Sequence, residues 1–487
     1  MNQFVGRKHE LKELNSLKHF NRVCLVTIQG RRRIGKSRLV QEFAKDKRFL
    51  LFTGEVPVKV PTAQGQRDVF SSQLAKQLNV PEKTYSSWLN AFFDLTDYIT
   101  DEPTVILFDE ISWMSTDDER LISQLKIWFD QYLQKWPQLT VILCGSVSTW
   151  IEKNVIRSTA LFGRITLKLE LKPLSLAECT QFLQQQGFRG SAFDILKILA
   201  ITGGVPWYLE QIDPQNMADE NIKNLCFRPT GVLVMDFDFI FHDLFNGHSS
   251  IYKNIIHILA AGMKNIDDVK KSLTSTPHVK LDDSGNDSLE DVVGNLVTAG
   301  FVTKHYPWSI KTEKASLNYL YRLSDNYIRF YIKYIEPNKA KIDGVGYDIR
   351  SLANLPGWDA TMGLHVENLL LNNRNALLQS IGIERADITA DNPYIQRNSN
   401  GERGCQIDYL IQTHAKNLFL CEFKFNKRSL GLEVITSVQE KIERFAAPPE
   451  FGIAPILFHM GEVAPAVLAS KYFYRIINIV DLLELRS

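Results

Sequence analysis

The sequence predicts a multidomain α/β protein, and three observations carry that prediction. The chain has 487 residues, which is too long for one hydrophobic core, so we expect three or four domains. Near its start, an apolar run, a glycine-rich loop and a helical pattern follow one another in the order strand, loop, helix. Near its end, residues 405–411 and 418–425 alternate like two neighbouring strands. Helical patterns fill most of the region between.

Composition describes an ordinary globular chain and excludes several classes. Hydrophobic residues make up 45% and charged residues 23%, and the net charge of +1 gives no global basic field for nucleic acid. The six cysteines include no C-x-x-C pair, so we expect buried, reduced thiols and no zinc site. There is no signal-peptide core and no run of 18 apolar residues. We therefore expect a cytoplasmic protein without membrane contact.

The glycine-rich loop has the spacing G-x-x-x-x-G-K-S of a phosphate loop. It lies between a predicted strand at Cys24–Ile28 and a predicted helix that begins at Arg38. In this spacing, backbone N–H groups curl around phosphates, Lys36 neutralises the outer phosphates and Ser37 offers a hydroxyl to Mg2+. The predicted nucleotide-binding residues are Gly30, Arg31, Arg32, Arg33, Ile34, Gly35, Lys36, Ser37 and Arg38. The three consecutive arginines either contact phosphates or are solvated loop charges, and the sequence leaves both open.

Two further apolar runs end in polar residues that suit hydrolysis. Thr104–Phe108 leads into Asp109 and Glu110. Asp109 is expected to hold Mg2+ and Glu110 to act as the general base on the attacking water. The run at residues 140–145 ends at Ser146, which either senses the outer phosphate or simply closes a Gly-Ser turn.

Together these segments resemble the archaeal/bacterial ATPase family in the STAND branch of the AAA+-related P-loop NTPases. The similarity also includes the opening Phe4–Leu11 and Thr202–Pro206, and it spans most of the first 335 residues. It implies ATP and Mg2+ as ligands, an adenine pocket lined by residues that include Val5, Gly6 and Arg7, and a lid helix starting at Pro206 near the base. Lys8 departs from the usual glutamate of the family's opening. Arg164 is an expected arginine finger or sensor, with an ordinary surface arginine as the alternative.

The middle of the chain reads as helical modules. We expect a P-loop core over residues 1–170, a helical lid over 171–235 and a winged-helix domain over 236–335, the last from three helical patterns and a hairpin. The resemblance to STAND ATPases implies that this module transmits the state of the ATPase core. Glu290 and Asp291 on the expected recognition helix disfavour phosphate contacts, and DNA reading stays the alternative. A polar linker over residues 336–346 would follow.

Residues 345–487 are expected to form a separate α/β domain with a second site. Strand alternation places Glu422 and Lys424 on one side of the second strand, and Asp408 on the neighbouring strand would complete a Mg2+ site. This D…E-x-K pattern resembles the PD-(D/E)xK nuclease superfamily, the restriction-endonuclease-like fold, although Ile407 replaces the proline. By that resemblance Glu367 is the helix glutamate beside the metal, and Gln439 is a polar residue of the following helix. A solvated ion pair and an inactive nuclease domain remain open alternatives.

These features predict an ATP-gated, Mg2+-dependent DNA nuclease, by analogy in defence or mobile-element control. Basic residues after the second site favour DNA as a partner, and they are Lys424, Lys427, Arg428, Lys441 and Arg444. The alternative is an ATP-driven regulatory switch whose C-terminal domain binds nucleic acid or protein without cutting. If Arg164 acts on a neighbouring subunit, the protein is a homo-oligomer.

Overall fold

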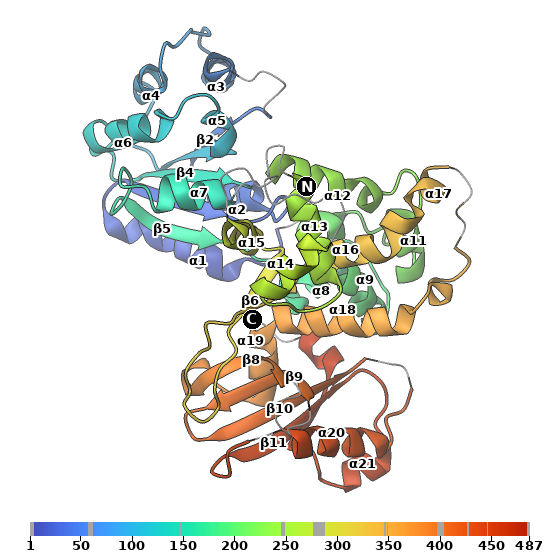
Figure 1. The fold of residues 1–487 in the computed structure, drawn as a ribbon. Helices are drawn as coiled ribbons and strands as arrows, with labels where there is room; N and C mark the ends of the chain where they lie inside the picture. The colour runs from blue at the N-terminus through green and yellow to red at the C-terminus, as the bar shows by residue number, and fades with distance from the viewer. Residues whose placement is uncertain are drawn as a thin grey trace. The chain divides into compact units, whose positions relative to one another are not determined.

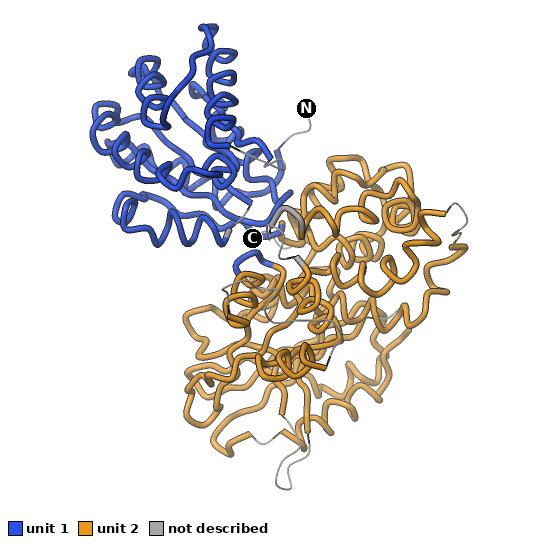
Figure 2. Tube along the Cα trace, turned by 45° about the horizontal axis from the view of Figure 1, so that its top comes forward, with its two compact units in different colours: residues 1–173, 298–300 blue, residues 174–297, 301–487 orange. Residues whose placement is uncertain are grey.

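The chain was described from a computed structural model covering residues 4–56, 62–146, 148–244, 249–275, 288–344, 347, 349–396, 404–425, 428–445 and 447–484. It divides into two compact units, shown in blue and orange in Figure 2. Unit 1 comprises residues 1–173 and 298–300, and unit 2 comprises residues 174–297 and 301–487. Among the described helices, none is long and apolar enough to cross a membrane.

Unit 1 is built on a five-stranded parallel sheet with the strand order β2-β3-β4-β1-β5. The strands are β1 (Cys24–Gln29), β2 (Arg48–Thr53), β3 (Thr104–Asp109), β4 (Leu139–Gly145) and β5 (Ile165–Glu170). The three strands expected around the phosphate loop are therefore present as β1, β3 and β4. Because parallel strands share a carboxyl edge, the polar residues that follow these strands meet at that edge.

Helices cover both faces of this sheet, as Figure 1 shows. The covering helices are α1 (Lys8–Ser16) and α2 (Lys36–Phe43) on one face, and α3 (Ala63–Leu78), α4 (Trp88–Thr96) and α6 (Leu121–Gln131) on the other. Successive side chains of a strand point to opposite faces, so Val105 and Leu107 pack with α2, and Ile106 and Phe108 with α3 and α4. The α/β prediction for the core is confirmed.

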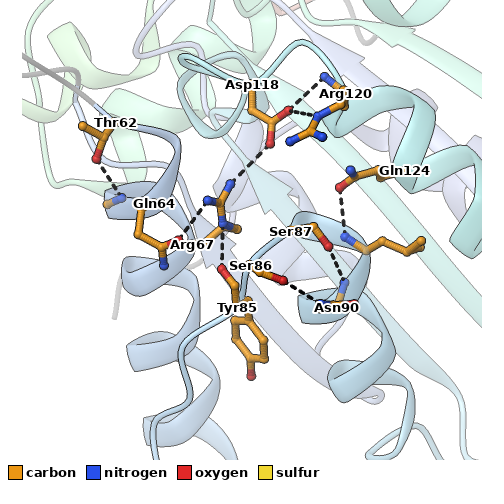
Figure 3. Close-up of polar contacts among 12 residues, drawn as sticks. Thr62, Gln64, Arg67, Tyr85, Ser86, Ser87, Asn90, Asp118, Arg120 and Gln124 are labelled. Atoms are coloured by element: carbon orange, nitrogen blue, oxygen red, sulfur yellow. Dashed lines mark hydrogen bonds and ion pairs between the residues drawn. The ribbon is translucent and has the colours of Figure 1, made fainter.

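A buried ion pair ties α3 to the segment that follows the acidic strand β3 (Figure 3). Arg67 Nη1 lies 3.3 Å from Asp118 Oδ2, and Arg67 Nε donates to the Tyr85 carbonyl at 2.9 Å. The Arg67 and Asp118 side chains are 9% and 3% exposed. Arg120 contacts the other Asp118 oxygen at 3.3 Å. This network holds the residues downstream of Glu110 in place.

Unit 2 begins with helices and a short hairpin. The helices are α8 (Leu176–Gln185), α9 (Ala192–Thr202), α10 (Pro206–Glu210), α11 (Ala218–Cys226), α12 (Val232–Leu244), α13 (Ser249–Ala260), α14 (Ile266–Thr274), α15 (Leu289–Thr298) and α16 (Asn326–Phe330). The strands β6 (Val302–His305) and β7 (Leu320–Leu323) pair in antiparallel register. The three helical patterns and the hairpin lie where the sequence predicted them.

The hairpin connection is packed into the core of the C-terminal sheet. Trp308 and Ile310 join the same hydrophobic cluster as the sheet residues Leu410 and Leu418. Trp308 Nε1 donates to Gln412 Oε1 at 2.6 Å, and Gln412 Nε2 donates to the Ile310 carbonyl at 3.1 Å. This connection therefore packs against the C-terminal sheet and is hydrogen-bonded to it.

The C-terminal part of unit 2 is a mixed five-stranded sheet with the order β12-β11-β10-β9-β8. Its strands are β8 (Ile388–Gln396), β9 (Cys405–Thr413), β10 (Asn417–Lys424), β11 (Gly452–His459) and β12 (Arg475–Asn478). Its helices include α18 (Trp358–Asn372), α19 (Arg374–Ile381), α20 (Glu433–Arg444) and α21 (Pro465–Ala469). The β8, β9 and β10 strands run antiparallel, and β10, β11 and β12 run parallel, with α20 as the crossover between β10 and β11 (Figure 1).

The segment expected to be a linker is mostly helical instead. A short 3-10 turn at Glu336–Asn338 runs into α17 (Lys339–Asp343). Lys339 and Asp343 form an ion pair one helical turn apart, and Ile342 is buried, which stabilises the helix. Val345 and Gly346 lie outside the described residues.

Candidate functional site

The phosphate loop connects β1 to α2 with glycines where other residues would not fit. Gly35 has φ 90°, a left-handed conformation that favours glycine. A Cβ on Gly30 would lie 2.7 Å from the Leu171 carbonyl oxygen, so the chains approach too closely for a side chain. Lys36 Nζ donates to the Gly30 and Arg31 carbonyls at 3.0 and 3.2 Å. The loop carbonyls thus hold the ammonium that the sequence assigns to the phosphates.

The arginines of this region differ in exposure. Arg31 is buried, Arg32 and Arg33 are half-buried, and Arg38 on the first turn of α2 is exposed. Ile34 is fully buried in the cluster beneath α2. None of the three consecutive arginines is fully exposed, and their contact with phosphates stays a prediction.

The acidic residues lie at the carboxyl edge of the sheet beside the loop. The Ser37 hydroxyl donates to Asp109 Oδ2 at 2.5 Å, so the two predicted Mg2+ ligands lie together. Glu110 takes a left-handed conformation, φ 51°, and its Oε2 accepts the Ser146 N–H at 2.9 Å and the Ser146 hydroxyl at 2.8 Å. Ser146 therefore orients the predicted general base, a partnership that the sequence alone did not indicate.

The N-terminal segment is tied directly to the loop. Arg7 is buried, and its Nη2 donates to the Ile34 carbonyl at 3.1 Å while Nη1 contacts Glu10 at 3.2 Å. Val5 is also buried, and Gly6 precedes Arg7 with a positive φ of 73°. The sequence placed these three residues at the adenine. The structure places Arg7 against the loop that would hold the phosphates.

Arg164 lies away from the phosphate loop. It precedes β5, and the register pairs Ile165 with Leu25 and Glu170 with Gln29. At about 3.3 Å per residue, the six residues of β5 separate Arg164 from the carboxyl edge by roughly 20 Å. Its guanidinium makes two contacts with Asp130, at 2.6 and 2.8 Å. Asp130 raises the pKa of Arg164 and Arg164 lowers that of Asp130. An action of Arg164 on phosphates would thus have to be on another subunit.

The predicted lid motif lies in unit 2, at the junction of two helices. Gly203 and Gly204 both have positive φ, 64° and 77°, and Pro206 opens α10 at a position where its missing N–H costs nothing. A Cβ on Gly204 would lie 2.7 Å from the Leu174 carbonyl oxygen. This tight turn explains why the segment needs consecutive glycines before the proline.

The second site lies where β9 and β10 run side by side. The antiparallel register pairs Leu410 with Leu420 and Tyr409 with Cys421, so the next step sets Asp408 beside Glu422. Asp408 Oδ2 accepts the Phe423 N–H at 2.9 Å. The two carboxylates that the sequence assigned to a metal site are therefore brought together by strand pairing.

Two lysines neutralise Glu422. Lys424 Nζ lies 2.7 Å from Glu422 Oε1, and Lys441 Nζ lies 2.6 Å from Glu422 Oε2 and 3.9 Å from Asp408 Oδ1. The Glu422 side chain is only 2% exposed. Burial lowers the pKa of Lys441, but the nearby Asp408 and Glu422 outweigh burial and raise it overall. The sequence prediction named Lys441 only as a basic residue that favours DNA and did not predict its contacts with the two carboxylates.

Glu367 on α18 adds negative charge near this pair. Burial, followed by repulsion from Asp408, raises its pKa to about 7. Burial, followed by repulsion from Glu422, raises the pKa of Asp408 to about 6. Within the described ranges, no three His, Cys, Asp or Glu side chains are grouped so that they could hold one metal ion. Buried acidic charge with hard oxygen donors fits a divalent cation, and Asp408 and Glu422 are the pair that would hold it.

Other predicted features of this region have mixed outcomes. Gln439, named by the resemblance as a polar residue of the following helix, is exposed on α20. Lys441, two positions later, follows the buried residues Val434 and Val438 by seven and three residues, and that spacing was the available signal. Arg428 and Arg444 are exposed, while Lys427 lies outside the described residues. All six cysteines are buried, as expected, and none of these six described residues forms a disulfide.

A family model matches the N-terminal part of the chain, and a relative and solved structures match larger shares of it. Residues 4–212 match the family model described as an ATPase domain predominantly from Archaea. An uncharacterized protein of Methanocaldococcus jannaschii is 25% identical over 358 residues, which is 72% of each chain. A Walker-type ATPase of Pyrococcus abyssi aligns with 68% of this chain and 96% of its own at 17% identity and a TM-score of 0.49. A STAND protein of Pyrococcus horikoshii aligns with 78% of this chain and 50% of its own at 16% identity and a TM-score of 0.30.

The family match and the geometry of the phosphate loop agree. A parallel sheet places a G-x-x-x-x-G-K-S loop next to an acidic strand end, and the matched family is one of ATPases. Residues 4–212 are therefore similar to the ATPase domains of that family, and they hold the phosphate loop and the acidic end of β3.

Proposed function

We propose that ATP binding and hydrolysis in this protein control a Mg2+-dependent DNA nuclease site on the C-terminal sheet. The observation that carries the proposal is the pairing of Asp408 with Glu422 across β9 and β10, with two lysines against Glu422. Two adjacent carboxylates and an ammonium are the groups that metal-assisted phosphodiester hydrolysis uses. As in the sequence prediction, the setting would be defence or mobile-element control.

In this proposal each residue has a defined task. Asp408 and Glu422 would hold Mg2+, which would polarise the phosphate and lower the pKa of a bound water. Lys424 lies on the same strand as Glu422 and would steady the negative charge that develops on the phosphate oxygens as water attacks. Glu367, with its pKa raised to about 7, would accept a proton from that water.

Contacts of α9 with the C-terminal part support gating. Phe193 near the start of α9 stacks on Phe425, next to Lys424, with ring centroids 5.4 Å apart and an interplanar angle of 2°. Near the end of α9, the Ala200 carbonyl contacts His365 Nδ1 at 2.7 Å. His365 precedes Glu367 by two residues on α18. Because α9 leads into the lid motif that the family resemblance assigns to the nucleotide, its movement would reach both sides of the second site.

The test is cleavage by a variant that keeps ATP turnover. Lys424→Ala is expected to abolish Mg2+-dependent cutting of plasmid, linear or single-stranded DNA and to leave ATP hydrolysis unchanged. Lys416→Gln, an exposed lysine in the turn between β9 and β10, is the matched control and should behave like the wild type. Unchanged cutting by Lys424→Ala would remove the nuclease proposal.

One observation favours a second function. Both Glu422 oxygens contact ammonium groups, which also suits a site that binds a phosphate backbone without cutting it. In that case the protein is an ATP-driven switch that binds nucleic acid or a protein partner. Assembly or DNA binding would then respond to Lys36→Ala, with no cleavage in Mg2+ or Mn2+ by any variant.

A further inference from the structure

Lys441 reaches the second site from a helix rather than from the strand that carries Lys424. The apolar face of α20, formed by Val434, Ile435 and Val438, is buried against the sheet. Helical periodicity puts Lys441 on the same face, three residues after Val438. Its side chain is therefore directed to the sheet and is only 24% exposed.

The Lys441 ammonium lies between the two carboxylates of the site. It is 2.6 Å from Glu422 Oε2 and 3.9 Å from Asp408 Oδ1. The other Glu422 oxygen contacts Lys424, and the other Asp408 oxygen accepts the Phe423 N–H. Lys441 thus contacts those carboxylate oxygens that the backbone and Lys424 do not, one from each acid.

Those same two oxygens are the ones that a divalent cation would use. Mg2+ binds carboxylate oxygen at about 2.0–2.1 Å, and it demands a regular arrangement of ligands. A cation bridging Asp408 and Glu422 would therefore lie close to the present position of the Lys441 ammonium. Two cations at one position repel each other strongly in a site as buried as this one.

We propose that Lys441 occupies the metal position between Asp408 and Glu422 in the resting protein and moves to the substrate phosphate when a divalent cation takes its place. This inference rests on the proposed nuclease function and adds a positioning residue to it. In the resting site, the ammonium groups of Lys424 and Lys441 balance the carboxylates of Asp408 and Glu422. A cation arriving alone leaves the Lys441 ammonium without a partner, whereas a cation arriving with a phosphodiester gives it a new one. Metal and DNA should therefore bind cooperatively.

The proposal predicts that removing the Lys441 ammonium increases the affinity of the site for a divalent cation. The full-length protein is titrated with Mn2+ in the absence of nucleotide and DNA, and electron paramagnetic resonance measures the concentration of free Mn2+. The Asp408→Asn variant defines which binding belongs to this site. Lys441→Gln is expected to bind Mn2+ at that site at least about tenfold more tightly than the wild type, because a nearby positive charge is gone. Lys441→Arg should keep the affinity of the wild type.

Arg444→Gln is the matched control, since it removes a charge one turn further along α20, where Arg444 pairs with the exposed Glu440. Its Mn2+ affinity should equal that of the wild type. If Lys441→Gln melts at a lower temperature, Lys441→Met repeats the test with the packed alkyl stem retained. Equal or weaker Asp408-dependent Mn2+ binding in folded Lys441 variants overturns the inference and leaves the nuclease proposal standing. If no variant shows Asp408-dependent Mn2+ binding, both proposals fail.

Discussion

The two candidate sites use the same residue types, acid, lysine and a neighbouring hydrogen-bond donor, but pair them differently. In unit 1, Asp109 accepts the Ser37 hydroxyl and Glu110 accepts the Ser146 hydroxyl and N–H, while Lys36 donates to backbone carbonyls. In unit 2, Glu422 contacts two ammonium groups. In unit 1 the lysine contacts no acid of the site in the described contacts, whereas in unit 2 two lysines form ion pairs with Glu422.

This difference indicates the charge of the ligand that each site can bind. A nucleotide brings phosphates and Mg2+ together, so a site with neutral partners on its acids and a lysine held by carbonyls can accept both at small cost. A site that already neutralises its acids with lysines resists a lone cation. We infer that the first site is ready for its ligand, whereas the second needs a ligand of both charges.

The largest effects are expected from replacing one acid of each site by its amide. Asp109→Asn removes the carboxylate that Ser37 contacts, so ATP turnover should fall at least about a hundredfold, while Asp408-dependent Mn2+ binding stays intact. Glu422→Gln should do the reverse. Phosphate release and Mn2+ titration on both variants provide the check. If either variant lost both ATP turnover and Asp408-dependent Mn2+ binding, the two sites would not be independent of each other.

The buried Arg67–Asp118 ion pair is expected to stabilise the fold rather than to take part in either candidate site. Asp118→Asn leaves the buried Arg67 without its charged partner, and breaking such a pair costs roughly 3–5 kcal/mol. Thermal unfolding of the full chain should shift down clearly, whereas Glu119→Gln, an exposed neighbour, should melt like the wild type. Equal melting of the two variants would contradict a structural role for the pair.

Ser146→Ala tests the orientation of Glu110. The variant loses the hydroxyl donor but keeps the backbone N–H, so the turnover number for ATP should fall about tenfold with ATP binding unchanged. Steady-state hydrolysis and nucleotide affinity measure the two quantities. Ser123→Ala, an exposed serine on α6, serves as control, and identical rates for the two variants would assign Ser146 to the turn alone.

The smallest effect is a pH dependence of stability. The folded-state pKa of Glu367 is about 7, above its ordinary value of about 4.3, so the unfolded chain loses this proton first as pH rises. The free energy of unfolding should therefore decrease between about pH 4 and pH 7. Glu367→Gln should remove on the order of 1–3 kcal/mol of that decrease. Melting curves at pH 5 and pH 8 measure it, with the exposed Asp359→Asn as control. Parallel curves for wild type and Glu367→Gln would contradict the raised pKa.

Local spacing made much of this molecule predictable. The phosphate loop lies between β1 and α2 because its glycines and flanking apolar runs are adjacent in sequence, and strand alternation placed Asp408 beside Glu422. The contact of Lys441 with the two carboxylates was not predicted, because it depends on how α20 packs on a sheet formed by distant segments. The Arg164–Asp130 contact also joins residues far apart in sequence, so no motif could indicate it.

The most direct test of the central claim measures DNA cleavage with and without ATP in the wild type and in Lys36→Ala. Supercoiled, linear and single-stranded DNA are incubated with Mg2+ or Mn2+, and products are followed over time. We expect ATP to change the cutting rate of the wild type at least about tenfold. Lys36→Ala, which lacks the ammonium predicted to bind phosphate, should not respond to ATP. Cutting that is the same with and without ATP in the wild type, or no cutting of any DNA, would contradict it.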